Sequence, residues 1–373
     1  MCTAIRFTDV EGNMFFGRNL DWSCGYGQHV LVTPRDYMRK WAFGPNGDAA
    51  FGVASGSGGD AVFNTASGPN GDAAFGATTD LSGAASGASP VMYGGEPCEH
   101  AVMGMGIAVD NTPLYFDCAN EAGLGIAGLN FPGYAQFEEG PVAGKINVAA
   151  YEFPLWVVSC FESVDELERV LDQVAIVAKP VSEEYPVSLL HWIVCDGKRS
   201  IVIEYAHDGM HVHRNDFDVL ANQPTFDWHA ENIRNYLSLT SRYPKPVEWG
   251  TATLEPYGSG SGMRGIPGDY YSPSRFVRAA YLNTNYPTVK SEGENVLRMF
   301  HTLCGVAMID GAAQMANGFF ERTVYTGGYS ANTRTYYYNE YEDPAIKYVS
   351  LADVDVSGAD LMVPEPKLWP ALA

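Results

Sequence analysis

The order of strand-like and helix-like segments most strongly limits how this chain can fold. Because few consecutive strands have a helix between them, a doubly wound parallel sheet does not fit. The order predicts an α+β protein, in which two antiparallel sheets pack together and helices cover their outer faces. In sequence order, the patterns indicate strands within 2–41 and 113–131, helices at 147–161 and from Ser163, strands within 191–213, helices at 225–239, 272–283 and 294–308, and strands within 322–351.

One segment departs from this pattern. Residues 44–95 are rich in Gly, Ala, Ser and Asp, and no Lys or Arg occurs between Lys40 and Lys145. The nonapeptide at 44–52 recurs at 68–76, and two copies are too few for a repeat architecture. So little of this segment can be buried that its chain entropy is not offset. We therefore expect one domain over residues 1–373 with a flexible insertion at 44–95.

The charge balance excludes several classes of partner. A formal net charge of -21 leaves no basic footprint for nucleic acid, and anionic membrane surfaces would repel the chain. Charged residues interrupt the first dozen positions, so we expect no secretory leader, and no stretch reaches transmembrane length. The seven cysteines follow no disulfide-like spacing, which favours reduced thiols and a cytoplasmic location.

Cys2 is the first candidate for chemistry. Removal of Met1 would place a thiol and a free α-amine on the same residue. Both groups titrate within about two pH units of neutrality, so the amine can take the thiol proton without a histidine. Most cysteines at position 2 have no catalytic role. The hypothesis that Cys2 is a nucleophile therefore depends on the residues that follow it.

Arg18 and Asp21 follow in a second strand, after a turn at 11–13. The hairpin returns both side chains toward Cys2. A guanidinium there would favour the thiolate, and a carboxylate would hold the α-amine. The alternative is a cross-strand ion pair, worth about 0–1 kcal/mol if exposed.

Three further residues are candidates for the site. Asn130 ends an expected strand and Asn222 lies where a strand meets a helix, so both could donate to an oxyanion. Because Asn favours turns, an ordinary turn role explains each position better than an oxyanion role does from the sequence alone. Arg275 lies in the first turn of a helix, where a cation is unfavourable, and this conflict hints at function or at a tolerated surface residue.

The sequence supports neither a metal nor a cofactor. His211 and His213 share one strand face beside His207, but no third ligand stands at an established spacing. The glycine-rich stretches contain neither a P-loop lysine nor a dinucleotide fingerprint.

Several motifs in one order resemble the choloylglycine hydrolases, a family of bile salt hydrolases and penicillin V acylases. The resemblance spans nearly the whole chain except 44–95. It rests on Met1-Cys2-Thr3, Phe16-Gly17-Arg18-Asn19-Leu20-Asp21, Glu121-Ala122-Gly123-Leu124, Ala127-Gly128-Leu129-Asn130-Phe131-Pro132, Leu190-His191-Trp192, Asn222-Gln223-Pro224-Thr225-Phe226-Asp227-Trp228-His229, Gly265-Ile266-Pro267-Gly268-Asp269-Tyr270 and Ser274-Arg275-Phe276.

The resemblance implies an αββα four-layer sandwich of the N-terminal nucleophile hydrolase type. It also implies catalytic roles for six residues: Cys2, Arg18, Asp21, Asn130, Asn222 and Arg275. The expected reaction is hydrolysis of the amide bond in glycine- or taurine-conjugated bile acids. Asn130 favours this branch because penicillin V acylases tend to carry Tyr there. The alternatives are a penicillin V or other N-acyl amide hydrolase, and a non-catalytic binding protein. We also expect a homotetramer or another homo-oligomer.

Overall fold

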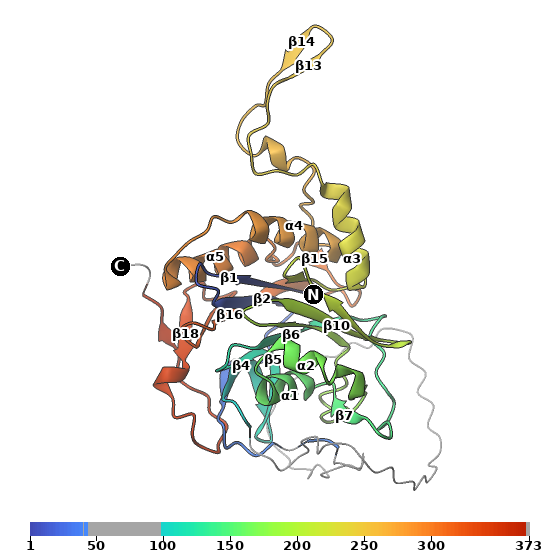
Figure 1. Ribbon diagram of the computed structural model, residues 1–373, viewed down its shortest axis with the longest axis vertical. Coiled ribbons are helices and arrows are strands. Elements are labelled where there is room, and N and C mark those ends of the chain that lie inside the picture. The colour runs from blue at the N-terminus through green and yellow to red at the C-terminus, as the bar shows by residue number, and fades with distance from the viewer. Residues whose placement is uncertain (40, 44–97, 371–373) are drawn as a thin grey trace.

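The computed structural model describes residues 1–39, 41–43 and 98–370 of the chain. The insertion expected at 44–95 lies outside these residues, so its flexibility remains a prediction. The described residues form two large antiparallel sheets that pack face to face (Figure 1).

The first sheet contains both ends of the chain. Its central pairs are β1 with β2 and β2 with β16, all antiparallel. In spatial order its strands are β12 (Val219–Leu220), β1 (Cys2–Thr8), β2 (Met14–Trp22), β16 (Phe320–Ser330), β17 (Thr335–Glu340), β18 (Lys347–Ser350) and β19 (Lys367–Leu368), and β15 (Ala313–Gln314) pairs with β16.

The second sheet comes from the middle of the chain. In spatial order its strands are β11 (Gly209–Arg214), β10 (Ser200–Ala206), β9 (Leu190–Cys195), β6 (Gly125–Asn130), β5 (Thr112–Asn120), β4 (Val102–Val109) and β3 (His29–Thr33). Both faces of this sheet are buried. In β9, Ile193 and Cys195 join the core between the sheets, whereas Trp192 and Val194 pack on the outer side. This explains why residues 192–195 of the strand are continuously apolar rather than alternating.

Helices close the sandwich on both sides. Helices α4 (Ser272–Asn285) and α5 (Glu292–Cys304) cover the first sheet, and α1 (Phe153–Cys160) and α2 (Val164–Glu168) lie beneath the second (Figure 1). Gly17 and Gly328 permit the close approach of α5, because a Cβ at either position would lie within 2.7 Å of the Met299 sulfur. The expected αββα layering is confirmed.

The structure corrects the helices expected between 147 and 174. Residues 146–149 form β7 (Ile146–Ala149), which pairs in parallel with β8 (Val174–Val177), so α1 begins only at Phe153. Ser163 does cap α2, accepting a hydrogen bond from the Glu166 backbone N–H. However, α2 has only five residues, because the chain then turns into a short 3-10 helix and β8. The single helix expected from Ser163 is therefore divided between three elements.

The remaining helices differ mainly at their ends. Helix α3 (Phe226–Asn232) continues as a 3-10 helix to Tyr236, and the N-cap of α4 is Tyr271, one residue before the expected Ser272. Beyond α3, the chain forms an arm that projects from the body and ends in β13 (Val247–Trp249) and β14 (Ala252–Leu254) (Figure 1). Within the described residues, no helix is both long and apolar enough to cross a membrane.

Candidate active site

The register of β1 and β2 brings the Cys2 thiol and the Arg18 guanidinium together. Cys2 pairs with Leu20 and Ala4 pairs with Arg18, so the two side chains project from the same face of the sheet. Arg18 Nη2 lies 2.6 Å from Cys2 Sγ, and Arg18 Nη1 donates to the carbonyls of Phe116 and Gly128 at 3.1 Å. These bonds hold a fully buried cation against the thiol.

A buried carboxylate supports the charge of Arg18. Asp117 accepts hydrogen bonds from the hydroxyls of Tyr325 and Tyr336, at 2.5 and 2.6 Å. Burial opposes the charge on Arg18, but the nearby Cys2 thiol and Asp117 raise the pKa of the guanidinium above its ordinary value. Arg18 therefore stays cationic at hydrogen-bond distance from the Cys2 sulfur.

Met1 extends the antiparallel ladder by one residue. Its carbonyl accepts from the Asp21 backbone N–H at 2.8 Å, and its ammonium donates to the Asp21 carbonyl at 2.7 Å. The ammonium also lies 2.8 Å from Glu321 Oε1, a carboxylate that is almost completely buried. Asp21 and Glu321 are thus the acidic residues nearest this end of the chain.

The Asp21 carboxylate is held on one side only. Its Oδ1 accepts from the Thr323 hydroxyl at 2.6 Å, whereas Oδ2 is buried without a hydrogen-bond partner and lies 3.9 Å from Arg275 Nη1. Burial raises the pKa of Asp21 above its ordinary value, although Arg275 and the N-terminal ammonium oppose this. The free oxygen leaves room for one more donor.

Asn222 connects the remaining candidate residues. Its Oδ1 accepts from the Cys2 backbone N–H at 2.6 Å and from Arg275 Nη2 at 2.7 Å, and its Nδ2 donates to the Asn130 carbonyl at 2.7 Å. Arg275 also donates to the Cys2 carbonyl at 2.5 Å. Burial lowers the pKa of Arg275, while the neighbouring Asp21 opposes this.

All six candidate residues therefore belong to one cluster. Arg18 contacts the sulfur, whereas the hydrogen bonds of Arg275 reach the backbone of Cys2 and the side chain of Asn222. Sequence reasoning missed Glu321 and Thr323, which are distant in the sequence and reach the cluster only because β16 pairs with β2. No pattern in the sequence marked either residue.

A cavity of about 260 Å³ opens beside the thiol. Four candidate residues line it: Cys2, Arg18, Asp21 and Asn130. Its other walls are mainly apolar and aromatic, and include Leu20, Trp22, Tyr26, Ile107, Leu114, Phe116, Tyr151, Pro154, Val187 and Leu190. This composition suits an apolar ligand whose reactive end reaches the sulfur.

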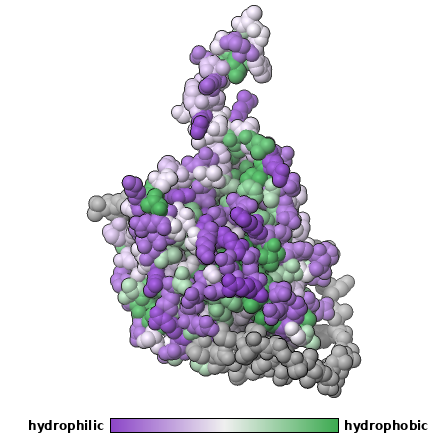
Figure 2. Space-filling view, in the orientation of Figure 1, coloured by the Kyte–Doolittle hydropathy of each residue, from purple (hydrophilic) through white to green (hydrophobic). Residues whose placement is uncertain are grey.

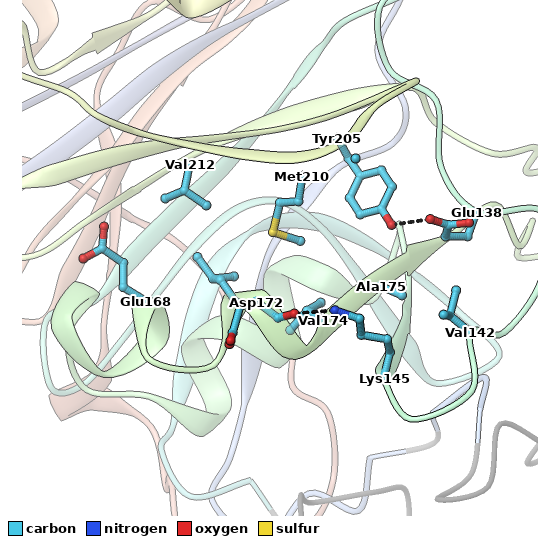
Figure 3. A pocket seen from close by; sticks show the side chains of 12 residues that line it. Glu138, Val142, Lys145, Glu168, Asp172, Val174, Ala175, Tyr205, Met210 and Val212 are labelled. Atoms are coloured by element: carbon cyan, nitrogen blue, oxygen red, sulfur yellow. Dashed lines mark hydrogen bonds between the residues drawn. The ribbon is translucent and has the colours of Figure 1, made fainter.

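A larger cavity of about 640 Å³ shares no lining residue with this site. Figure 3 shows its polar groups turned toward one another: the Tyr205 hydroxyl donates to Glu138, and Lys145 donates to the carbonyl of Asp172. Both of these pairs are hydrogen-bonded within the protein, and we do not assign this cavity a reaction.

The histidines of the β10–β11 hairpin contact carboxylates. His211 pairs with Asp208 at 2.8 Å, and His213 pairs with Asp227 at 3.1 Å. Among the residues that the structure describes, no group of three or more His, Cys, Asp or Glu side chains is placed to hold a metal ion.

Comparisons with known proteins agree with this geometry. The family model described as linear amide C–N hydrolases, choloylglycine hydrolase family, matches residues 2–364. A bile salt hydrolase/transferase from Bifidobacterium longum subsp. longum is 49% identical over 362 residues, which cover 97% of this chain and 99% of that protein.

Two solved structures share the fold. The C2A mutant of the conjugated bile acid hydrolase from Clostridium perfringens superposes with a TM-score of 0.79 at 29% identity, covering 98% of this chain and 97% of that one. Penicillin V acylase from Agrobacterium tumefaciens gives 0.67 at 16% identity, covering 96% and 90%, and supports the fold alone. The expected N-terminal nucleophile hydrolase fold is confirmed, and this chain is an amide-hydrolysing enzyme of the choloylglycine hydrolase family.

Proposed function

We propose that this enzyme hydrolyses the amide bond of bile acids conjugated to glycine or taurine, with Cys2 as the nucleophile. The observation that carries the proposal is the Cys2 thiol, which lies 2.6 Å from the buried Arg18 guanidinium at the wall of a mostly apolar cavity. The similar proteins from Bifidobacterium longum and Clostridium perfringens are named for hydrolysis of bile salts or conjugated bile acids.

The nucleophile forms once Met1 is removed. The nitrogen of Cys2 then becomes a free α-amine, 2.6 Å from Asn222 Oδ1 and next to the Asp21 strand position. The amine accepts the thiol proton, and Arg18 stabilises the resulting thiolate by a charge-assisted hydrogen bond. The unpartnered Asp21 Oδ2 then orients the ammonium.

The thiolate attacks the amide carbonyl and forms a tetrahedral intermediate. The Asn130 side chain and the second N–H of Asn222 Nδ2, whose first N–H donates to the Asn130 carbonyl, stabilise the oxyanion. The ammonium of Cys2 protonates the leaving amine, and the C–N bond breaks to leave a thioester. The amine then deprotonates a water molecule, which hydrolyses the thioester and releases the bile acid.

The cavity suits the steroid part of such a substrate. Its aliphatic and aromatic walls can remove a ring system from water at about 25 cal/mol per Å². Asn130, rather than a Tyr, lines the cavity beside Cys2 and leaves the oxyanion region polar.

The test measures Met1 removal and hydrolysis on the same protein. The intact mass should show chains that lack Met1, and only these should release glycine from glycocholate, faster than they hydrolyse penicillin V. The Cys2→Ala variant serves as the matched control and should release none. Equal activity of chains that retain Met1 would refute the amine mechanism, and a higher kcat/KM for penicillin V would refute the substrate.

We also propose that the chain forms a homotetramer or another homo-oligomer through its projecting arm. Trp249 and Tyr257 on the arm, and Leu237 at its base, are largely exposed. Figure 2 shows apolar residues on the arm and around its base. Aromatic residues of this kind are typical of buried interface centres. Light scattering should give a multiple of the 40.5 kDa chain, and the Trp249→Ala variant should shift it toward the monomer. A parent protein that is monomeric would contradict this proposal.

A cytoplasmic location is consistent with the cysteines. All seven are free thiols, including the proposed nucleophile, and a reducing compartment preserves them. Cell fractionation with a thiol-blocking reagent would test this, and activity recovered outside the cell membrane would contradict it.

A further inference from the structure

His191 lies where the two asparagine segments of the site meet. Strand β9 pairs with β6 so that His191 is opposite Leu129, one residue before Asn130. The imidazole is fully buried and stacks on Phe131, with ring centroids 4.1 Å apart and planes inclined by 7°. Its Nε2 lies 2.8 Å from the carbonyl of Ala221. One ring therefore contacts the residue after Asn130 and the residue before Asn222.

Hydrogen bonds hold the His191 ring on both edges. Nδ1 lies 3.1 Å from Glu204 Oε1, which also accepts from the Phe226 backbone N–H at 2.9 Å. Burial alone would raise the pKa of Glu204, but hydrogen bonds from His191 and His213 lower it to about 2. The buried ring therefore bridges the Glu204 side chain and the Ala221 carbonyl, and it cannot turn without breaking one of these contacts.

A second buried histidine, His229, contacts the backbone of Asn222. Its Nε2 lies 2.9 Å from the Asn222 carbonyl, and its buried Nδ1 has no partner. Burial lowers the pKa of His229 to about 4, so this ring is neutral and donates from Nε2 alone. Two buried histidines, His191 and His229, therefore contact the successive carbonyls of Ala221 and Asn222.

We propose that His191 is a positioning residue, which fixes the Ala221 carbonyl from its buried site and thereby aims the Asn222 side chain at the reacting carbonyl. Asn222 has little freedom to correct an error, because its side chain already bonds Cys2 N, Arg275 and the Asn130 carbonyl. A displacement of about 1 Å at such a site typically costs about 100-fold in rate. The inference rests on the proposed function, since it assigns Asn222 to the oxyanion.

The kinetic test uses His191→Gln in protein that lacks Met1. We expect kcat for glycocholate to fall about 10- to 100-fold, with KM within about threefold of the parent value. In the Asn222→Ala background the same change should lower kcat less than about twofold, because the group that His191 aims is gone. His213→Gln is the matched control. It removes a histidine 3.6 Å from the other oxygen of Glu204 and should keep kcat within about twofold.

A second measurement does not depend on activity. A crystal structure of the His191→Gln variant should show the Ala221 carbonyl and the Asn222 side chain displaced, whereas the His213→Gln variant should keep both in place. An unmoved Asn222 side chain in the His191→Gln variant would overturn the inference. So would a His191→Gln effect on kcat that is equally large in the Asn222→Ala background, or a fall in melting temperature at unchanged kcat. A parent enzyme that hydrolyses no bile acid conjugate would refute the proposed function and leave the crystal structure of the variant to judge His191.

Discussion

The Asp21→Asn substitution separates a catalytic role of this carboxylate from a structural one. The exchange keeps the shape of the side chain, and the Asn oxygen can still accept from the Thr323 hydroxyl 2.6 Å away. It removes the negative charge that lies 3.9 Å from Arg275 and, after loss of Met1, next to the α-amine of Cys2. We therefore expect a large loss of rate and a small change in stability.

The structure indicates the size of the effect on stability and of the effect on rate. At 3.9 Å, two unit charges attract by about 4 kcal/mol with an effective dielectric constant of about 20. However, burial raises the pKa of Asp21 despite Arg275, so the folded protein already disfavours the charged form. The lost attraction and the relieved desolvation nearly cancel, and unfolding should change by no more than about 1 kcal/mol. Losing the orienting group for the amine should lower kcat by about 10²- to 10⁴-fold, or about 3–5 kcal/mol in the barrier.

The assay compares glycine release from glycocholate with urea denaturation of the same preparation. Intact mass must first show that Met1 is absent, because a variant that retains Met1 would be inactive for a different reason. Asp165→Asn is the control, since Asp165 is an exposed carboxylate bound to Lys198 and Arg199. A kcat within about threefold of the parent, or a stability loss above about 3 kcal/mol with near-normal kcat, would refute the reasoning.

Four further predictions concern the same enzyme. The Cys2→Ser variant should retain less than about 1% of the activity, measured as glycine release, because the α-amine activates a hydroxyl poorly. The Arg18→Lys variant keeps the charge but cannot reach the two carbonyls and the sulfur together, so kcat should fall about 10- to 100-fold at similar KM. The pKa of His229 is about 4 in the folded protein and 6.5 in the unfolded chain, so between these values only the unfolded chain binds the proton. The free energy of unfolding should therefore fall by about 3 kcal/mol from pH 6.5 to 4, and the His229→Gln variant should lack this loss in urea titrations. Replacing residues 44–95 by a short Gly-Ser linker should preserve hydrolysis and change KM, because a change in loop length costs little entropy. Failure of that protein to fold would contradict the prediction that these residues are an insertion in a single domain.

The sequence predicts the layers of this fold better than the ends of its helices. Strand patterns near both termini and in the middle of the chain were sufficient for two sheets with helices outside. The segment 147–161 misled because β7 is mostly apolar apart from the half-buried Asn147, and the start of α1 is apolar and buried, so no clear periodicity separates strand from helix there. Residues 146–149 form a strand because they pair in parallel with β8, whose residues follow 28 positions later in the chain.

Prediction of the candidate site from the sequence has a similar limit, because it finds local contacts and misses distant ones. Cys2, Arg18 and Asp21 lie on one hairpin, so their proximity followed from local register. Glu321 approaches Met1 across 320 positions, and its neighbour Thr323 supports Asp21. Such contacts depend on which strands become neighbours, and no local pattern contains that information.

The place of Met1 in the sheet has a consequence for how the enzyme matures. In the folded chain, Met1 is hydrogen-bonded to Asp21 at both backbone groups and its ammonium is paired with Glu321. A processing peptidase needs that end extended and free, so folding and processing compete for the same residue. On the mechanism proposed above, we therefore expect Met1 to be removed more easily from the nascent chain, before β16 and its Glu321 have been synthesised. Cells that make the protein faster than they trim it should then accumulate folded chains in which the Cys2 nitrogen is still a peptide N–H.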